Sequence, residues 1–325
     1  MNKFKTESRL NRAITRFLAH KRALGHRYRQ EAWLLQGLGR FVEKSGRRDL
    51  EANCFARWLT SLRDRHPNTR RKWYQIVRHF CCYRRRGEPG CFLPSAEGAA
   101  RRQPYVTPII MDPRQIARMM AIASELPNTS ASPLRAPALR LAIVLLYTCG
   151  LRLGELLRLT MDDVEQEGTV LRIRESKFHK SRLVPLSRSA AGELQTYLRK
   201  RRKAFPVHSA TPLLCNRHGR RLRPFSHPGL QRAINQLMDV AQVRDEQGRR
   251  PRVHDLRHTF AVQALIRWYR AGTDVQTQLP KLALYMGHVS IESTEHYLHW
   301  VPTLQRLASD RFEQRFGRII QGGSQ

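Results

Sequence analysis

The sequence contains no long hydrophobic run. Eighteen consecutive apolar residues occur nowhere in its 325 residues, so neither a membrane-spanning helix nor a membrane partner is expected. The first twenty residues, MNKFKTESRLNRAITRFLAH, also lack the apolar core of a secretory signal peptide. These two absences predict a cytoplasmic protein.

Cysteine is scarce, and its spacing is not that of a metal site. The six cysteines form no C-x-x-C pair, and several lie among apolar residues with helical spacing. This pattern disfavours both disulfides and zinc coordination. We expect free, mostly buried thiols at Cys54, Cys81, Cys82, Cys91, Cys149 and Cys215.

Acidic residues are few relative to basic ones. The chain has 26 Asp and Glu against 59 Lys and Arg, a net charge of +33. Residues 1–102 carry 25 Lys and Arg against 8 Asp and Glu, so the excess is not confined to a tail. A surplus this large repels itself unless a polyanion neutralises it. The charge therefore predicts a nucleic-acid partner, bound either by a DNA clamp of two basic domains or by an RNA-binding or ribosome-associated protein.

The chain is long enough for two domains. It is 41% hydrophobic, which allows each domain a core of its own. We predict a helical core-DNA-binding domain at 1–95, a linker at 96–108 and a second domain at 109–325. The linker is rich in Gly, Pro, Ala and Arg and has no hydrophobic periodicity.

The first domain is predicted to be a four-helix bundle. Apolar stripes with helical spacing occur at 10–18, 33–42, 55–62 and 73–83. The opposite face of the last stripe is almost purely positive, whereas a solvated face usually mixes charges of both signs. We expect this face to contact DNA phosphates through Arg70, Arg71, Lys72 and Arg78.

The second domain is predicted to be mainly helical with one small β element. TVLRIRESKFHKSRLVPL alternates apolar and polar residues on both sides of a polar turn, which is typical of a β-hairpin. One helix should begin after an Asp112 cap with Pro113 in its first turn. Further helices are expected at 138–147, 188–204, 226–241, 255–271, 280–286, 291–299 and 302–316.

Four segments of the second domain carry residues suited to one reaction. YTCGLRLGELLRL contains Arg152, and RESKFHKSRLVPL contains Lys177. HDLRHTFA contains His254 and Arg257, and MGHVSIESTEHY contains His288 and, nine residues later, Tyr297. In order and in local text this set resembles the tyrosine recombinase (phage integrase) family over residues 105–320. The resemblance implies a mainly α protein, with a SAM-like core-binding bundle followed by a mixed α+β catalytic domain.

The residue types fit cleavage of a DNA phosphodiester. Arg152 and Arg257 can present guanidinium forks to the two non-bridging oxygens. Tyr297 can attack phosphorus, and Lys177 can protonate the departing 5′-oxygen, with Lys180 as the alternative acid. The product is a 3′-phosphotyrosyl link that a 5′-hydroxyl can later displace. This chemistry requires no cofactor or metal, and the sequence has neither a P-loop nor a carboxylate cluster.

The resemblance assigns the remaining site residues. His254 would assist proton transfer and His288 would hydrogen-bond the phosphate. Lys180 and Arg182, in the predicted hairpin, would bind DNA. Glu155 is interpreted instead as the structural partner of a buried cation.

Other interpretations of single residues stay open at this point. Tyr297 could be a packing aromatic. His254 and His258 lie four residues apart, as zinc ligands can, although HDLRH lacks the Glu of H-E-x-x-H. For metal binding we therefore predict none.

The resemblance also implies how the protein works. It predicts a site-specific recombinase in the nucleoid that integrates or excises a mobile element. Four protomers would assemble on double-stranded DNA and exchange strands through a Holliday junction, with companion recombinases of the same element as further partners. The last helix, at 302–316, is predicted to be amphipathic and would dock on a neighbouring protomer or, alternatively, pack on its own domain. The alternatives are a type IB topoisomerase and a non-catalytic DNA-binding protein of the same fold.

Overall fold

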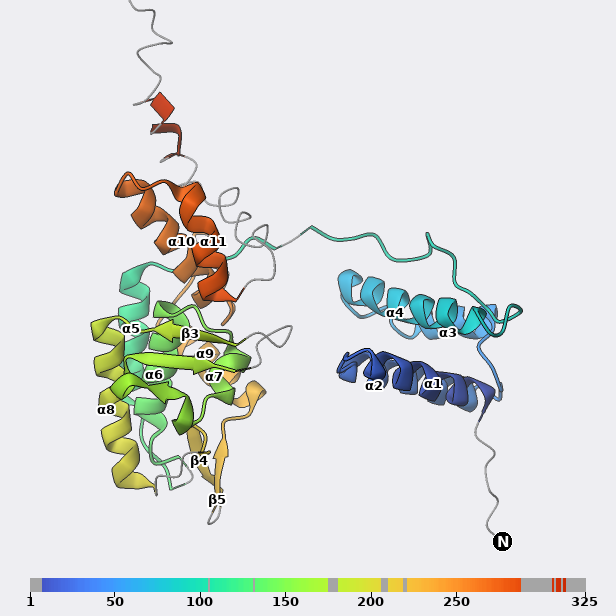
Figure 1. Cartoon of the computed structure of the whole chain (residues 1–325), viewed down its shortest axis with the longest axis horizontal. Coiled ribbons are helices and arrows are strands. Elements are labelled where there is room, and N and C mark those ends of the chain that lie inside the picture. Colours follow the sequence, from blue (N-terminus) through green and yellow to red (C-terminus); the bar gives the residue numbers. More distant parts are fainter. Residues whose placement is uncertain are drawn as a thin grey trace, which may run out of the picture. The chain divides into compact units, whose positions relative to one another are not determined.

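The computed structural model comprises two compact units, Met1–Val106 and Thr107–Gln325. It describes residues 8–104, 106–130, 132–174, 181–205, 210–218 and 221–287, with 306, 308–310 and 312–313. The boundary between the units, after Val106, lies within the segment 96–108. Figure 1 shows the helices of each unit.

The first unit is a bundle of four helices. These are α1 (Arg9–Ala23), α2 (Arg29–Lys44), α3 (Ala52–Thr60) and α4 (Pro67–Arg85). Each helix follows one of the four apolar stripes. The stripes form a single core in which Leu10, Phe17, Leu35, Leu38 and Phe80 have no exposed surface. The helices form where apolar residues at helical spacing can be buried together.

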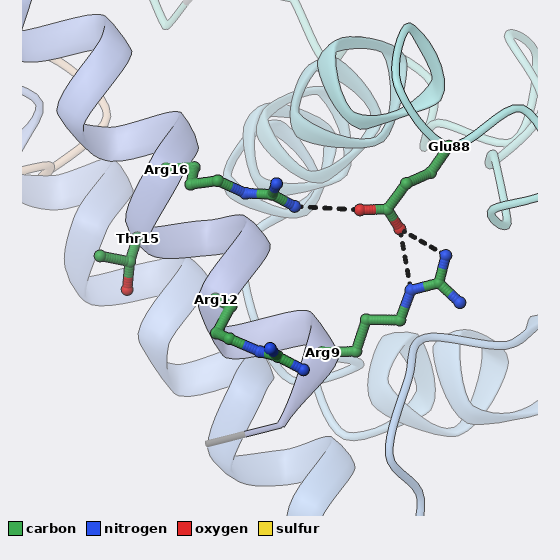
Figure 2. Close-up of a pocket in the computed structure, with 5 residues that line it drawn as sticks. All are labelled: Arg9, Arg12, Thr15, Arg16 and Glu88. Atoms are coloured by element: carbon green, nitrogen blue, oxygen red, sulfur yellow. Dashed lines mark hydrogen bonds and ion pairs between the residues drawn. The ribbon is translucent and has the colours of Figure 1, made fainter. Parts of the chain in front are cut away.

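A buried arginine joins the end of α4 to other parts of the bundle. The Arg84 guanidinium forms ion pairs with Asp49 and, at 2.7 Å, with Glu88. Glu88 also accepts hydrogen bonds of 3.1 Å from Arg9 Nε and Arg16 Nη2 of α1 (Figure 2). Two of the few carboxylates in this unit are therefore used to hold helices together.

The second unit is organised around one buried helix. Its helices are α5 (Pro113–Glu125), α6 (Arg135–Thr148), α7 (Leu153–Arg158), α8 (Arg188–Ala204), α9 (His227–Val240), α10 (Asp255–Arg270) and α11 (Val275–Met286). Nine of the fourteen residues of α6 are buried. This helix contacts α5, α8, α9 and α10, so its buried apolar residues are not confined to one stripe.

Two small antiparallel sheets complete this unit. The first has the order β1 (Val164–Glu165), β2 (Val170–Ile173) and β3 (Arg182–Pro185), with the short 3₁₀ helices Met161–Asp163 and Gln166–Gly168 beside β1. β2 and β3 pair in the register Ile173↔Arg182, which confirms the predicted hairpin. The second sheet, β4 (Cys215–His218) with β5 (Arg221–Pro224), was not predicted from the sequence. It lies at the opposite end of the unit from α10 and α11 (Figure 1).

Helices α10 and α11 pack on each other and lead to the end of the continuous described chain. The predicted start of α11 at Pro280 was wrong. The helix begins at Val275, where the side chain of Asp274 accepts a 3.0 Å hydrogen bond from the Gln276 backbone N–H. It ends at Gly287, whose φ of 66° is left-handed. The predicted helix 291–299 and most of 302–316 lie outside the described residues.

The mainly α fold with small β elements is confirmed. All six cysteines are free thiols; four are buried, and Cys82 and Cys91 are partly buried. Among the helices that the structure describes, none is both long enough and apolar enough to span a membrane.

Candidate active site

Three arginines converge on the last turn of α11. Three successive backbone carbonyls at this helix end each accept a hydrogen bond from a different arginine. Carbonyls at a helix C-terminus have no partner within the helix and carry partial negative charge, so cations bind there favourably. The pairs are Arg182 Nε with Tyr285 O (2.7 Å), Arg257 Nη2 with Met286 O (2.7 Å) and Arg152 Nη2 with Gly287 O (2.8 Å).

Two of these arginines are those proposed from sequence to bind a phosphate. Arg152 precedes the first residue of α7, and Arg257 lies in the first turn of α10. Arg257 is 1% exposed and also donates from Nη1 to the Gly150 carbonyl. The two guanidinium groups are thus anchored to the carbonyls of two consecutive residues.

A glycine turn makes this arrangement possible. Gly150 has a φ of 58° and lies just before the Arg152 segment. A Cβ atom at this position would lie 2.5 Å from the Phe260 ring, so only glycine fits both the backbone conformation and the space. The turn therefore presents the Gly150 carbonyl to Arg257 and positions Arg152 at the start of α7.

Glu155 links two of the arginines. Its side chain is 2% exposed and accepts hydrogen bonds from Arg152 Nη1 at 2.7 Å and from Arg182 Nη2 at 2.9 Å. Burial alone would raise the pKa of this carboxyl. The hydrogen bond and charge of Arg182, together with the Arg152 backbone N–H and charge, outweigh burial and lower the pKa to about 2. The interpretation of Glu155 as the structural partner of a buried cation is confirmed.

His254 lies immediately before α10, beside the arginines. The residue is exposed to solvent, yet the protein atoms packed around it still desolvate its imidazole in part. This desolvation and the positive charge of Arg257 lower the pKa of His254 to about 4. A neutral imidazole at pH 7 can accept a proton.

The imidazole rings of His254 and His258 are perpendicular, with centroids 4.7 Å apart. Within the described part of the chain, no group of three or more His, Cys, Asp and Glu side chains is placed to hold a metal ion.

A hollow of about 360 Å³ opens beside Arg152 and His254. Its apolar surface comes from side chains of α6, the Gly150 turn and the segment before α10. Its polar lining includes His227 and Gln231 of α9 and Arg252. Cationic and polar side chains therefore line this hollow together with apolar ones.

The structure brings together three of the six residues predicted to be catalytic. Arg152 comes from the segment before α7, and His254 and Arg257 come together from the start of α10. Lys177, His288 and Tyr297, like Lys180, lie outside the described residues. The carbonyls that hold Arg152 and Arg257 belong to the two residues directly before His288 in the chain.

The predicted DNA-contacting residues differ in their surroundings. Arg182 is nearly buried and bound to Glu155. On α4, Arg71 Nη1 donates to the Ala100 carbonyl at 3.1 Å, and Lys72 Nζ lies 3.4 Å from Gln30 Oε1. The Nε atoms of Arg70 and Arg78 are covered and have no hydrogen-bond partner among the described residues. DNA binding by these residues stays a prediction.

Sequence reasoning missed the carbonyl cluster at the end of α11. A local signal for this cluster was Gly287 in MGH, because glycine commonly follows the last residue of a helix. The carbonyls at such a helix end are open to arginines from other segments. The contacts themselves join residues 103, 135 and 29 positions apart. No local pattern specifies such pairs.

The helical unit with small sheets, gathering two arginines and a histidine at a helix end, has the fold of tyrosine recombinase catalytic domains. The phage integrase family matches residues 110–302. The chain belongs to this family.

Relatives in sequence extend over both units. The chain is 30% identical over 311 residues to y4rB of Sinorhizobium fredii, whose name gives it as an inferred integrase/recombinase; the match covers 95% of this chain and 98% of y4rB. It is 33% identical over 153 residues to the tyrosine recombinase XerC of Chromobacterium violaceum, covering 47% and 45% of the two chains.

Solved structures show the same fold at low identity. The Tn1549 transposon integrase in complex with transposon right end DNA has a TM-score of 0.63 and 15% identity, covering 93% of this chain and 98% of that one. The XerH recombinase bound to its palindromic difH substrate has a TM-score of 0.62 and 18% identity, covering 88% and 79%.

Proposed function

We propose that this protein is a site-specific DNA recombinase that cleaves and rejoins strands through a 3′-phosphotyrosyl intermediate at Tyr297. The observation that carries the proposal is the convergence of Arg152 and Arg257 on adjacent carbonyls at the end of α11. The chain then continues directly into His288 and, nine residues later, the tyrosine. Family membership supports the same assignment.

The two arginines would stabilise the phosphorane-like transition state. Arg152 has a side chain 25% exposed and keeps N–H groups beyond its bonds to Glu155 and Gly287. Donors held in place before the reaction stabilise developing charge without reorganising, and losing one commonly slows a reaction by about 10²–10³. Their anchoring to backbone carbonyls provides this preorganisation.

The other side chains would manage protons. Tyr297 loses its proton on attack at phosphorus and becomes esterified to the 3′-phosphate. Lys177 donates a proton to the 5′-oxygen that leaves as a hydroxyl. His254, whose pKa lies near 4, stays neutral and can accept a proton near the nucleophile. His288 would hydrogen-bond a phosphate oxygen.

Religation reverses these steps with a different 5′-hydroxyl. The phosphotyrosyl ester conserves the energy of the broken linkage, so no external energy source is required. We propose that four protomers carry out two such exchanges on paired double-stranded DNA sites through a Holliday junction. The names of y4rB and of the Tn1549 transposon integrase support a role in moving a mobile element, with companion recombinases as partners.

The test is a nicked suicide substrate, which traps the covalent complex because the cleaved fragment diffuses away. Wild-type protein should form a covalent adduct that is stable to denaturing electrophoresis. Tyr297→Phe should bind the same DNA and form no adduct, while Tyr269→Phe, a packing tyrosine of α10, should react normally. An adduct that persists in Tyr297→Phe would remove this tyrosine from the mechanism.

The assay also separates the alternatives. Relaxation of any supercoiled plasmid without recombinant product would indicate a type IB topoisomerase. Tight binding of a specific site by wild-type protein with no adduct would indicate a non-catalytic DNA-binding protein. Recombinant product from two sites, dependent on Tyr297, is the outcome that we expect.

A further inference from the structure

Arg182 is built into the protein interior. Its side chain is 8% exposed, and its nitrogens bond to the protein on three sides. Nη1 and Nη2 donate to the two oxygens of Glu155 at 3.2 and 2.9 Å, and Nε donates to the Tyr285 carbonyl at 2.7 Å. A bidentate carboxylate pair fixes a guanidinium in both position and plane. Each of the three guanidinium nitrogens of Arg182 therefore already has a partner in the protein.

We propose that Arg182 is a positioning residue of the active site, not a DNA contact: it holds Arg152 and the end of α11 in the geometry that strand cleavage requires. This inference rests on the proposed recombinase function. Within the described residues its guanidinium bonds to Glu155 and to the Tyr285 carbonyl, and we infer that it acts through these neighbours.

The first route runs through Glu155. This carboxylate accepts from Arg182 on one side and from both the backbone N–H and Nη1 of Arg152 on the other, at 3.0 and 2.7 Å. Because Glu155 is fixed by the bidentate contact, it fixes the rotamer of Arg152 in turn. Without Arg182, Glu155 would keep, within the described part of the chain, only Arg152 as a cationic partner and could turn with it.

The second route runs through α11. Arg182 is the first residue of β3, and it binds the Tyr285 carbonyl in the last turn of the helix. The Tyr285 hydroxyl returns a 3.2 Å hydrogen bond to the carbonyl of Pro185, the last residue of the same strand. The strand and the helix end are thus joined at both ends of β3. In the sequence, β3 follows the segment that contains Lys177, and α11 precedes the segment that contains Tyr297.

The packing around Gly287 shows how closely Arg182 fits the helix end. A Cβ atom on Gly287 would lie 2.8 Å from Arg182 Nη1 and 3.1 Å from its Cζ. The guanidinium is held by Glu155 through Nη1 and by the Tyr285 carbonyl through Nε. It would have to break a hydrogen bond to move away from the added Cβ. Glycine at this position is therefore required by the arginine as well as by the left-handed backbone.

The first experiment compares Arg182→Gln, Arg182→Lys and a matched control, Arg172→Gln. Arg172 lies on the adjacent strand β2 and also pairs with a glutamate, Glu165, but its side chain is 49% exposed. Single-turnover cleavage of the suicide substrate is measured at saturating DNA, together with the Kd for DNA and its salt dependence. The cleavage rate reports a loss of active-site geometry, and the Kd with its salt dependence reports a loss of DNA binding.

A positioning role predicts a change in rate without a change in affinity. Arg182→Gln should cleave about 10²-fold more slowly, since small misplacements of reacting groups can cost that much, while its Kd stays within about threefold of wild type. Arg182→Lys keeps the charge but not the bidentate fork, so its cleavage rate should lie between those of wild type and Arg182→Gln. Arg172→Gln should cleave at the wild-type rate.

A DNA contact predicts the reverse. Arg182→Gln would then bind more weakly, lower the slope of log K against log salt by about one, and regain wild-type cleavage at saturating DNA. That result, or wild-type behaviour in every measurement, would overturn the proposal. If wild-type protein itself forms no adduct, the failure belongs to the proposed function instead.

A second pair of variants decides the matter if Arg182→Gln does not fold. Gly287→Ala and Gly272→Ala each place alanine at a left-handed position that ends a helix, with φ of 66° and 69°. The added Cβ at Gly272 meets no atom within 4 Å, whereas at Gly287 it meets the Arg182 guanidinium. Both variants carry the same backbone strain. Cleavage slowed at least fivefold more by Gly287→Ala supports the proposal, and equal rates refute it.

Discussion

The buried carboxylate of Glu155 should contribute about 3 kcal/mol to the stability of the second unit at neutral pH. Its pKa falls from an ordinary 4.5 to about 2 in the folded protein, although burial opposes this, because Arg182 and Arg152 stabilise the charge. Each pH unit between the two values corresponds to about 1.4 kcal/mol. Since the side chain is 2% exposed, solvent screens the pair little. Glu155→Gln removes this charge and leaves Arg182 with a neutral partner.

The pH dependence follows from the direction of the shift. A carboxyl whose folded pKa is lowered stabilises the protein fully above its unfolded pKa, near 4.5. The contribution is lost as the pH falls from there towards 2, because the folded state must then take up a proton that the unfolded state already holds. The stability difference between wild type and Glu155→Gln should therefore be largest at pH 7 and shrink below pH 4.5.

Urea unfolding of the full chain measures this difference, and hydrogen exchange of residues 153–158 assigns the transition to the second unit. Glu193→Gln is the matched control, since Glu193 pairs with Arg140 at 2.5 Å but both side chains are about one-third exposed. That pair should contribute less than about 1 kcal/mol. A Glu155→Gln effect no larger than that of the control, or one that is constant from pH 5 to pH 3, would refute the reasoning.

Three further outcomes are expected. Histidine NMR should show His254 titrating well below 6.5, near pH 4, so that wild-type cleavage does not fall through protonation of this residue between pH 8 and pH 5.5; a midpoint at 6.5 would contradict the desolvation of its ring. Arg70→Gln combined with Arg78→Gln should lower the slope of log K against log salt for DNA by about 2, whereas Arg47→Gln, an exposed residue paired with Glu51, should change it less. Gly150→Ala should destabilise the second unit by about 2 kcal/mol or more, because both the left-handed backbone and the Phe260 ring oppose a Cβ, whereas Gly248→Ala carries only the backbone strain; equal melting temperatures for these two variants would remove the role assigned to the turn.

Local patterns in the sequence predicted most of the helices and the β2–β3 hairpin. Apolar residues at helical spacing located the four helices of the first unit, because a helix forms where such a stripe can be buried. The hairpin β4–β5 was missed because CNRH and RLRP have too little apolar alternation to indicate strands. Pro280 was taken as a helix start, although Asp274 caps the helix a turn earlier.

The chemistry-bearing residues were also found by sequence, but their roles were not equally readable. Arg152, Arg182 and Arg257 are the same residue type in comparable basic surroundings. The motif text singled out Arg152 and Arg257 and grouped Arg182 with the DNA contacts. Only the folded chain shows that Arg182 faces Glu155 and the end of α11.

The sequence by itself determined the charge, the helical stripes and the order of the motif residues, since each depends on residue type and short spacing. Tertiary structure alone decided which carboxylate and which backbone carbonyls each of these guanidinium groups meets. The physical reason is that a guanidinium acts according to its neighbours, and here some of those neighbours come from more than one hundred residues away. Gly150 meets Arg257 across 107 positions, and Gly287 meets Arg152 across 135.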